Sequence, residues 1–190
     1  MERRRLVFAS LAVLVVLIIG GVLVTRFWPS AQLNNASSAP INATATLGDK
    51  APEFTLPTTA GPFDLAHATK PVLLEFFATW CPHCQRETVV MNRLFAAYGS
   101  RVQFLAIPSS DTGMDETSPE SQFDVLQFQM RFNVKYPIAA YDPNLTVAKM
   151  YLKGGYPTIA VIDRNKTIAY INSGEIPFED LAGVLDKALK

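Results

Sequence analysis

Cys81 and Cys84 are the residues of this sequence best suited to chemistry. They are the only cysteines in 190 residues, and they stand in the motif Trp80-Cys-Pro-His-Cys84. A structural disulfide framework spreads several cysteines along the chain, whereas this pair is isolated and closely spaced. We therefore predict that the two thiols form and break a disulfide as part of a reaction.

The position of each cysteine predicts its role. Pro82 is a residue that favours the first position of a helix, so Cys81 should lie at a helix N-terminus, where unpaired N–H groups and the helix dipole stabilise a thiolate. A thiolate is the nucleophile in disulfide exchange, and Cys84 lies one turn further on the same face. We expect Cys81 to react with a partner and Cys84 to resolve the mixed disulfide. His83 can add positive charge or donate a hydrogen bond toward the sulfur.

A static disulfide or half of a zinc site is the alternative use of the pair. Zinc takes about four ligands, and the only histidines are His67 and His83. Such a set is hard to assemble from these residues, so we expect no metal. Exchange needs only the thiols, and we expect no cofactor.

The elements that must position the motif follow from the hydrophobic pattern. The nearly continuous apolar run 72–78 predicts a central strand buried on both faces. After the motif, apolar residues recur at helical spacing and Gly99 ends the pattern, so an amphipathic helix follows the strand directly. The residues on its buried face are Met91, Leu94, Phe95 and Tyr98.

The remaining pattern completes an α/β fold. Further strands are predicted at 102–107, 138–140, 158–162 and 168–171, and helices at 120–132, 144–152 and 177–189, after an initial hairpin over 53–65. This order predicts a mixed sheet flanked by helices. Asn144 is the expected cap of its helix. In the 120–132 helix, Phe123, Leu126 and Met130 recur at helical spacing, and we expect Phe123, Phe128 and Phe132 to belong to the core rather than to a binding groove.

The N-terminal residues predict a membrane anchor. Residues 6–24 carry no charge and approach the length of about 20 apolar residues that spans a bilayer. Clustered arginines at 3–5 should keep residues 1–5 cytoplasmic, with the anchor at 6–28 and the rest of the chain on the other side. A cleaved signal peptide is the alternative, but its apolar core usually runs only about 7–15 residues. Residues 29–48 are small and polar, which indicates a flexible linker to a domain at 49–190.

The motif and its surroundings resemble the thioredoxin superfamily. Trp80-Cys-x-x-Cys84 follows an apolar strand and precedes an amphipathic helix, and residues 49–190 resemble the membrane-anchored TlpA/ResA-like branch. The segments that carry the resemblance are Gly48-Asp-Lys-Ala-Pro-Glu-Phe54, the inserted helix at 120–132, Tyr141-Asp-Pro-Asn, Gly155-Tyr-Pro-Thr158 and Val161-Ile-Asp-Arg164. The resemblance implies a thioredoxin-like fold and thiol–disulfide oxidoreductase activity on client proteins that carry cysteine thiols or disulfides.

The resemblance also implies site residues. Pro157 matches the proline that is cis in this superfamily and faces the cysteines, so the backbone at Tyr156–Pro157 should pair with an extended substrate. Glu75 matches a buried acid, whose pKa should be raised by burial and which could exchange a proton with Cys84. Trp80 is expected to shield the cysteines and to offer contact surface.

The direction of electron flow is predicted differently by motif and by domain. The Cys-Pro-His-Cys motif resembles that of DsbA-like oxidases. Since the Pro-His pair between the cysteines acts directly on the thiolate, it favours an oxidising or isomerising role. TlpA/ResA-like relatives are commonly reductases in cytochrome c or copper-centre maturation, which is the alternative. A non-enzymatic copper chaperone is a third hypothesis, although its CxxxC pattern and distant histidine are not found here. The expected setting is periplasmic, with a membrane redox partner that recycles the disulfide, and the charge balance gives no indication of nucleic-acid binding.

Overall fold

The predicted central strand is β3 (Val72–Phe77), and all of its residues are buried. It pairs in parallel with β4 (Gln103–Pro108) and antiparallel with β5 (Thr158–Ile162). β6 (Ile168–Ser173) extends the sheet beyond β5, so the strand order is β4-β3-β5-β6. Burial on both faces explains the nearly unbroken apolar run, because neither side of β3 meets water.

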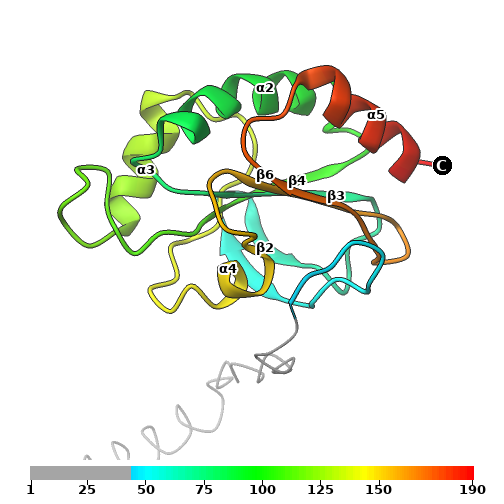
Figure 1. Cartoon of the computed structure of the whole chain (residues 1–190), viewed down its shortest axis with the longest axis horizontal. Coiled ribbons are helices and arrows are strands. Elements are labelled where there is room, and N and C mark those ends of the chain that lie inside the picture. The colour runs from blue at the N-terminus through cyan, green and yellow to red at the C-terminus, as the bar shows by residue number, and fades with distance from the viewer. Residues whose placement is uncertain (1–43) are drawn as a thin grey trace, which may run out of the picture. The chain divides into compact units, whose positions relative to one another are not determined.

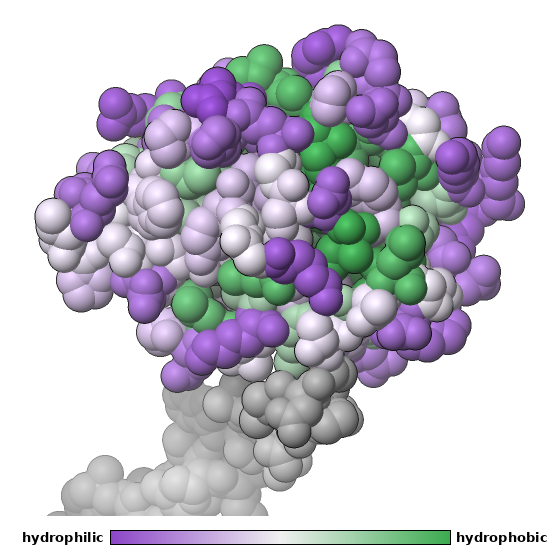
Figure 2. Space-filling view, viewed as in Figure 1, coloured by the Kyte–Doolittle hydropathy of each residue, from purple (hydrophilic) through white to green (hydrophobic). Residues whose placement is uncertain are grey.

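Helices cover both faces of this sheet (Figure 1). One face packs against α2 (Pro82–Tyr98), α3 (Gln122–Arg131) and α5 (Phe178–Ala188). The other packs against α4 (Thr146–Tyr151) and the hairpin of β1 (Thr55–Thr58) and β2 (Gly61–Asp64). The predicted α/β architecture with a mixed sheet is confirmed. Over the view shared by Figures 1 and 2, hydrophilic residues predominate and hydrophobic ones surface in smaller patches, as is usual for a folded domain.

This computed structural model describes residues 44–190. The predicted cytoplasmic N-terminus, the anchor at 6–28 and most of the predicted linker lie outside the described residues. Within residues 44–190, no helix combines the length and the hydropathy that a membrane span needs. The end of the predicted linker is part of the fold, since Ala45 is buried and its N–H donates to the carbonyl of Met150 at 2.7 Å.

Of the three phenylalanines expected in the core around α3, Phe128 is buried and Phe132 is partly buried against the core, but Phe123 is not. Val125 and Phe128 are buried, and Phe128 packs on Phe77 with ring centroids 4.7 Å apart. The expectation for Phe123 was wrong, because its side chain is 64% exposed, and Met130 is 73% exposed. The sequence of α3 carries two apolar stripes on roughly opposite sides of the helix. Only one can face the sheet, and hydrophobic spacing does not say which.

Two local predictions also differ from the structure. Asn144 does not cap α4, because Asp142 accepts the N–H of Thr146 at 2.8 Å and of Asn144 at 2.9 Å. The predicted strand at 138–140 forms only isolated bridges, from Ile138 to Ala106 and from the next residue to Thr58. The carboxylate of Asp142 accepts both amides in place of the expected cap Asn144. The segment 138–140 lies between β4 and β1 and forms a continuous ladder with neither strand.

Candidate active site

The two cysteines lie at the junction where β3 leads into α2. Cys81 is the N-cap of α2, with φ −74° and ψ 117°, and Pro82 occupies the start of the helix. The N–H of Cys84 donates to the sulfur of Cys81 at an N···Sγ distance of 3.4 Å. Both cysteines are free thiols, and both are largely buried, with 3% of Cys81 exposed. The sulfur of Cys81 thus caps the N-terminus of α2, and the helix starts at Pro82 as predicted.

The environments of the two thiols drive their pKa values apart. A hydrogen bond from the Cys84 side chain, helped by the backbone N–H groups of Cys84 and His83, lowers the pKa of Cys81 to about 6. Burial is the main cause that raises the pKa of Cys84 far above its ordinary value. Cys81 is therefore the thiolate at neutral pH and Cys84 holds its proton. This asymmetry is what an attacking and a resolving thiol require.

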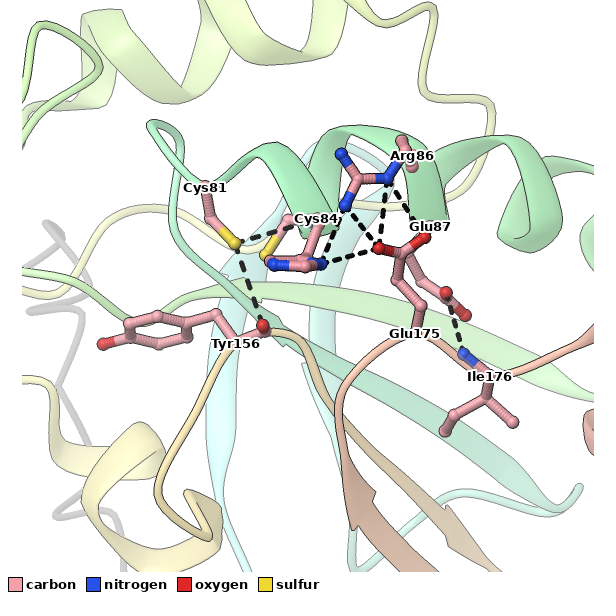
Figure 3. A network of polar contacts seen from close by, with 8 residues as sticks. Cys81, Cys84, Arg86, Glu87, Tyr156, Glu175 and Ile176 are labelled. Carbon is pink, nitrogen blue, oxygen red and sulfur yellow. Dashed lines mark hydrogen bonds and ion pairs between the residues drawn. The ribbon is translucent and has the colours of Figure 1, made fainter.

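The Tyr156–Pro157 peptide bond is cis and lies beside Cys81. The carbonyl oxygen of Tyr156 is 3.8 Å from the sulfur of Cys81, to which it points in Figure 3, and accepts the thiol proton when that is present. The carbonyl of Pro157 accepts the N–H of Gly174 at 2.8 Å. The structure therefore brings Tyr156 and Pro157 to the cysteines, 75 residues from Cys81 in sequence.

The Trp80 side chain is fixed beside the motif by two neighbours. Its ring N–H donates to the hydroxyl of Ser110 at 2.9 Å, and its ring meets that of Tyr156 edge to face, with centroids 6.0 Å apart. The hydroxyl of Tyr156 in turn donates to the carbonyl of Ser109 at 2.6 Å. Trp80 and Tyr156 are only partly buried, so this aromatic pair forms a firm surface next to Cys81.

Glu75 is buried in the middle of β3, as expected. Only 2% of the residue is exposed, and the hydroxyl of Tyr136 donates to its Oε2 at 2.7 Å. Within the described residues its Oε1 has no hydrogen-bond partner. Burial raises the pKa of Glu75 to about 8, and its negative charge in turn contributes to the raised pKa of Cys84. A group with a pKa near 8 can give and take protons at physiological pH.

A second buried acid, Glu87, lies on α2 three residues after Cys84. It is 1% exposed, and its Oε2 accepts the N–H of Ile176 at 3.1 Å. Burial raises the pKa of Glu87 to about 7. Its negative charge also raises the pKa of Glu75, so the two acids lie within electrostatic reach of each other behind the thiols.

The Nδ1 atom of His83 contacts two charged side chains rather than the sulfur of Cys81. It lies 2.6 Å from Oε1 of Glu175 and 2.8 Å from Nη2 of Arg86. The expected hydrogen bond from the ring to the sulfur of Cys81 is thus replaced by contacts with two charged side chains. The positive charge of His83 still lowers the pKa of Cys81, as the smallest of several causes.

Among residues 44–190, no group of three or more histidine, cysteine, aspartate or glutamate side chains is arranged to hold a metal ion. The site brings together two thiols and two buried acids.

Comparison with known proteins identifies the family. The Redoxin family model matches residues 46–185. The chain belongs to the Redoxin family. Thiol-disulfide oxidoreductase ResA of Geobacillus thermodenitrificans is 32% identical over 138 residues, which cover 71% of this chain and 74% of that protein. ResA of Geobacillus kaustophilus is 29% identical over 184 residues, covering 95% of this chain and 94% of that one.

The solved structures agree with this family. A Chlorobium tepidum protein assigned as the thiol:disulfide interchange protein DsbE shares 28% identity with a TM-score of 0.66, over 77% of this chain and 100% of that one. This Redoxin-family chain is therefore a thiol–disulfide oxidoreductase with a thioredoxin-like fold, as the resemblance implied. Its oxidoreductase homologues imply client proteins that bear thiols.

Sequence reasoning missed three residues of this Redoxin-family site. Glu87 left a signal, because it interrupts the buried face of α2 between Cys84 and Met91. An acid at such a position is either paired or functional. Arg86 and Glu175 left no such signal in the sequence. They contact each other across 89 positions of sequence, and only the tertiary structure joins them.

Proposed function

We propose that this Redoxin-family oxidoreductase reduces the disulfides of client proteins outside the cytoplasm. The observation that carries the proposal is the moderately acidic Cys81 thiol at the start of α2, paired with the buried, protonated Cys84. The low pKa gives a nucleophile at neutral pH, and the second thiol stands ready to release the client.

The reaction runs in two exchange steps. The Cys81 thiolate attacks one sulfur of the client disulfide, which breaks that bond and forms a Cys81–client disulfide, and the first client thiolate leaves. Cys84 then loses its proton and attacks the sulfur of Cys81. This forms the Cys81–Cys84 disulfide and releases the second client thiolate, so two electrons pass from the enzyme to the client.

Glu75 is the group proposed to accept the proton of Cys84. Its pKa of about 8 leaves part of the population ionised at neutral pH, and its charge acts on Cys84. A base whose pKa lies near the working pH is the most effective. The proton then passes to the departing client thiolate or to solvent. Tyr156 and Pro157 are proposed to pair with the client backbone, next to the surface formed by Trp80.

The reducing direction is favoured by how far the thiolate is stabilised. A pKa of about 6 for Cys81 is closer to the value of about 7 in thioredoxin than to about 3.5 in DsbA. Weaker stabilisation of the thiolate makes the dithiol form a better reductant. Glu175 supports this direction because its carboxylate offsets the positive charge of His83.

An oxidising or isomerising role is the second candidate. The Cys-Pro-His-Cys sequence favours it, since His83 stands next to the nucleophile and contributes positive charge. The same residues and the same exchange steps would serve, with electrons passing from client thiols to the Cys81–Cys84 disulfide.

The cellular setting is also proposed. The arginines at 3–5 and the apolar run at 6–24 support an anchor with the domain on the far side of the cytoplasmic membrane. There, a membrane redox partner would return the enzyme to its dithiol form. Clients in cytochrome c or copper-centre maturation fit the reducing direction. A topology reporter fused after residue 190 tests the orientation, and activity of a cytoplasmic reporter there would contradict it.

Direction is tested by the reduction potential of the Cys81–Cys84 couple in glutathione buffers. A value near about −270 mV supports the reductase, and a value near about −120 mV supports the oxidase instead. The matched control is Cys84→Ser, which should trap a mixed disulfide with a client peptide and fail to complete turnover. Failure of the wild-type protein both to reduce and to oxidise a model substrate would remove both candidates.

A further inference from the structure

The connection between β6 and α5 contacts three separate parts of the active site. The N–H of Gly174 donates to the carbonyl of Pro157 at 2.8 Å. The side chain of Glu175 meets the motif, and the N–H of Ile176 donates to Glu87 at 3.1 Å. Gly174 has φ of +101°, a conformation that glycine adopts readily. Consecutive residues thus contact the cis proline, His83 of the Cys-Pro-His-Cys motif and the buried acid Glu87.

Glu175 is the residue that fastens this connection to α2. Its Oε1 lies 2.6 Å from Nδ1 of His83, and it accepts hydrogen bonds from Nε of Arg86 at 3.0 Å and from Nη2 at 2.5 Å. Figure 3 shows the carboxylate between the arginine and the connection that leads to Ile176. The hydrogen bonds from Arg86 lower the pKa of Glu175 to about 2, so the carboxylate is charged at every working pH.

The contacts of His83 link its proton to this cluster. Nδ1 can donate to Glu175 only when it carries a proton, and it can accept from Arg86 only when it does not. Glu175 therefore accepts from the ring when Nδ1 carries a proton, and it compensates the charge of Arg86. Without the carboxylate, the charge of Arg86 would face the His83 ring uncompensated beside the N-terminus of α2, where the Cys81 thiolate lies.

We propose that Glu175 is a positioning residue for the exchange reaction: it holds the 174–176 connection on α2, limits the positive charge beside Cys81 and keeps the amide of Ile176 on Glu87. This inference deepens the proposed function and rests on it, because it makes Glu175 a residue that shifts the potential of the exchange couple toward reducing values. The groups that face the cluster are His83 and Arg86 from α2, with Glu87 behind them; Cys81 is the group on which it acts.

The proposal is tested by comparing Glu175→Ala with Glu179→Ala. Glu179 is an exposed acid in the first turn of α5, so its loss removes one negative charge from the same helix start without touching His83 or Arg86. We expect Glu175→Ala to lower the pKa of Cys81 and to make the couple more oxidising. The expected change is about two- to fivefold in the equilibrium constant with glutathione, or roughly 9–21 mV for a two-electron couple. Glu179→Ala should change neither quantity measurably.

Two further variants test whether the charge of Glu175 acts on Cys81 through His83 and Arg86. Glu175→Gln keeps an oxygen for Arg86 but no charge, and it should shift the Cys81 pKa in the same direction. In a His83→Ala/Arg86→Ala background, Glu175→Ala should leave the Cys81 pKa unchanged, because the cations it compensates are gone. Thiolate absorbance against pH reads the Cys81 pKa at low ionic strength, where such charges are least screened.

Equal shifts in Glu175→Ala and Glu179→Ala, or no shift in Glu175→Ala, would overturn the proposal. If Glu175→Ala fails to fold, Glu175→Gln alone decides the question. The outcome is independent of the direction of electron flow, since a wild-type potential in the oxidase range would remove the proposed reductase and still leave the shift between variants to be measured.

Discussion

The main-chain N–H of Cys84 points at the sulfur of Cys81, 3.4 Å away, inside the first turn of α2. The backbone of Cys84 therefore helps to keep the Cys81 thiol ionised. The Cys84 thiol is the largest cause of the lowered Cys81 pKa, and the Cys84 N–H adds to it. The two cysteines therefore titrate as a coupled pair rather than as two independent groups.

The reactivity of Cys81 should depend on pH through its own pKa. Alkylation of the reduced protein should rise around pH 6 and level off near pH 7.5, because the thiolate is the reactive form. Cys84→Ala should move this midpoint upward, because the side-chain donor to the sulfur of Cys81 is removed. An alkylation midpoint above pH 8 in the wild-type protein would contradict the site as described.

Stability of the reduced protein should carry the same signature. The pKa of Cys81 is lowered from 9.0 to about 6 on folding, so the folded state releases its proton first and stability rises with pH between these values. Cys81→Ser should lack this rise, and the difference between the two proteins should grow from pH 6 to pH 9. Urea unfolding under reducing conditions, at several pH values, measures it.

Replacing Glu75 should separate the two exchange steps. In Glu75→Gln, attack by Cys81 should be nearly unchanged, whereas resolution by Cys84 should slow by about 10-fold or more, because a positioned base is lost. Rapid mixing with a peptide disulfide, with quenching of the mixed disulfide, reads both rates. Equal slowing of both steps would argue against a role as the base for Cys84.

Glu75 also predicts a stability change of opposite sign. Its pKa is raised from 4.5 to about 8, so the folded state keeps a proton that the unfolded chain loses, and stability should fall as pH rises through this window. Glu75→Gln should remove that slope. The comparison is made by urea unfolding at pH 5 and pH 8, with the conservative Tyr136→Phe as a second variant, which should steepen the loss by removing the donor to Glu75.

The buried acid Glu87 should act on Glu75 through charge. Glu87→Gln removes a negative charge that raises the pKa of Glu75, so the pH midpoint of the resolution step should move downward. It should also stabilise the protein at pH 8 relative to pH 5, by roughly 1–3 kcal/mol, since an ionised carboxylate no longer has to be buried. Carboxyl NMR titration of Glu75 in both proteins checks the first expectation, and an unchanged midpoint would refute it.

The two stripes of α3 should respond differently to substitution. Phe128→Ala should cost about 3–5 kcal/mol of unfolding free energy, because a buried ring leaves a cavity. Phe123→Ser, on the stripe that is exposed, should change stability by no more than about 0.5 kcal/mol. Urea unfolding of both variants provides the test, and a large loss in Phe123→Ser would show that the stripe is covered.

Much of the active site could be predicted because it is local in sequence. An apolar run ending at Ala78, a proline at the start of the next helix and two cysteines one turn apart determine strand, helix and thiol placement through nearest-neighbour geometry. The burial of Glu75 could be predicted in the same way, because its neighbours along β3 are apolar and the strand is buried on both faces.

The contacts between segments that are distant in sequence were decided only by the tertiary structure. The stripe of α3 that faces the sheet depends on where Phe77 lies, and the contact of Glu175 with His83 depends on how β6 turns into α5. Hydrophobic periodicity records which side of a helix is apolar, but it carries no information on which other element approaches it. The sequence alone therefore determined the reacting thiols, and the packing of chain segments far apart in sequence decided the charges that surround them.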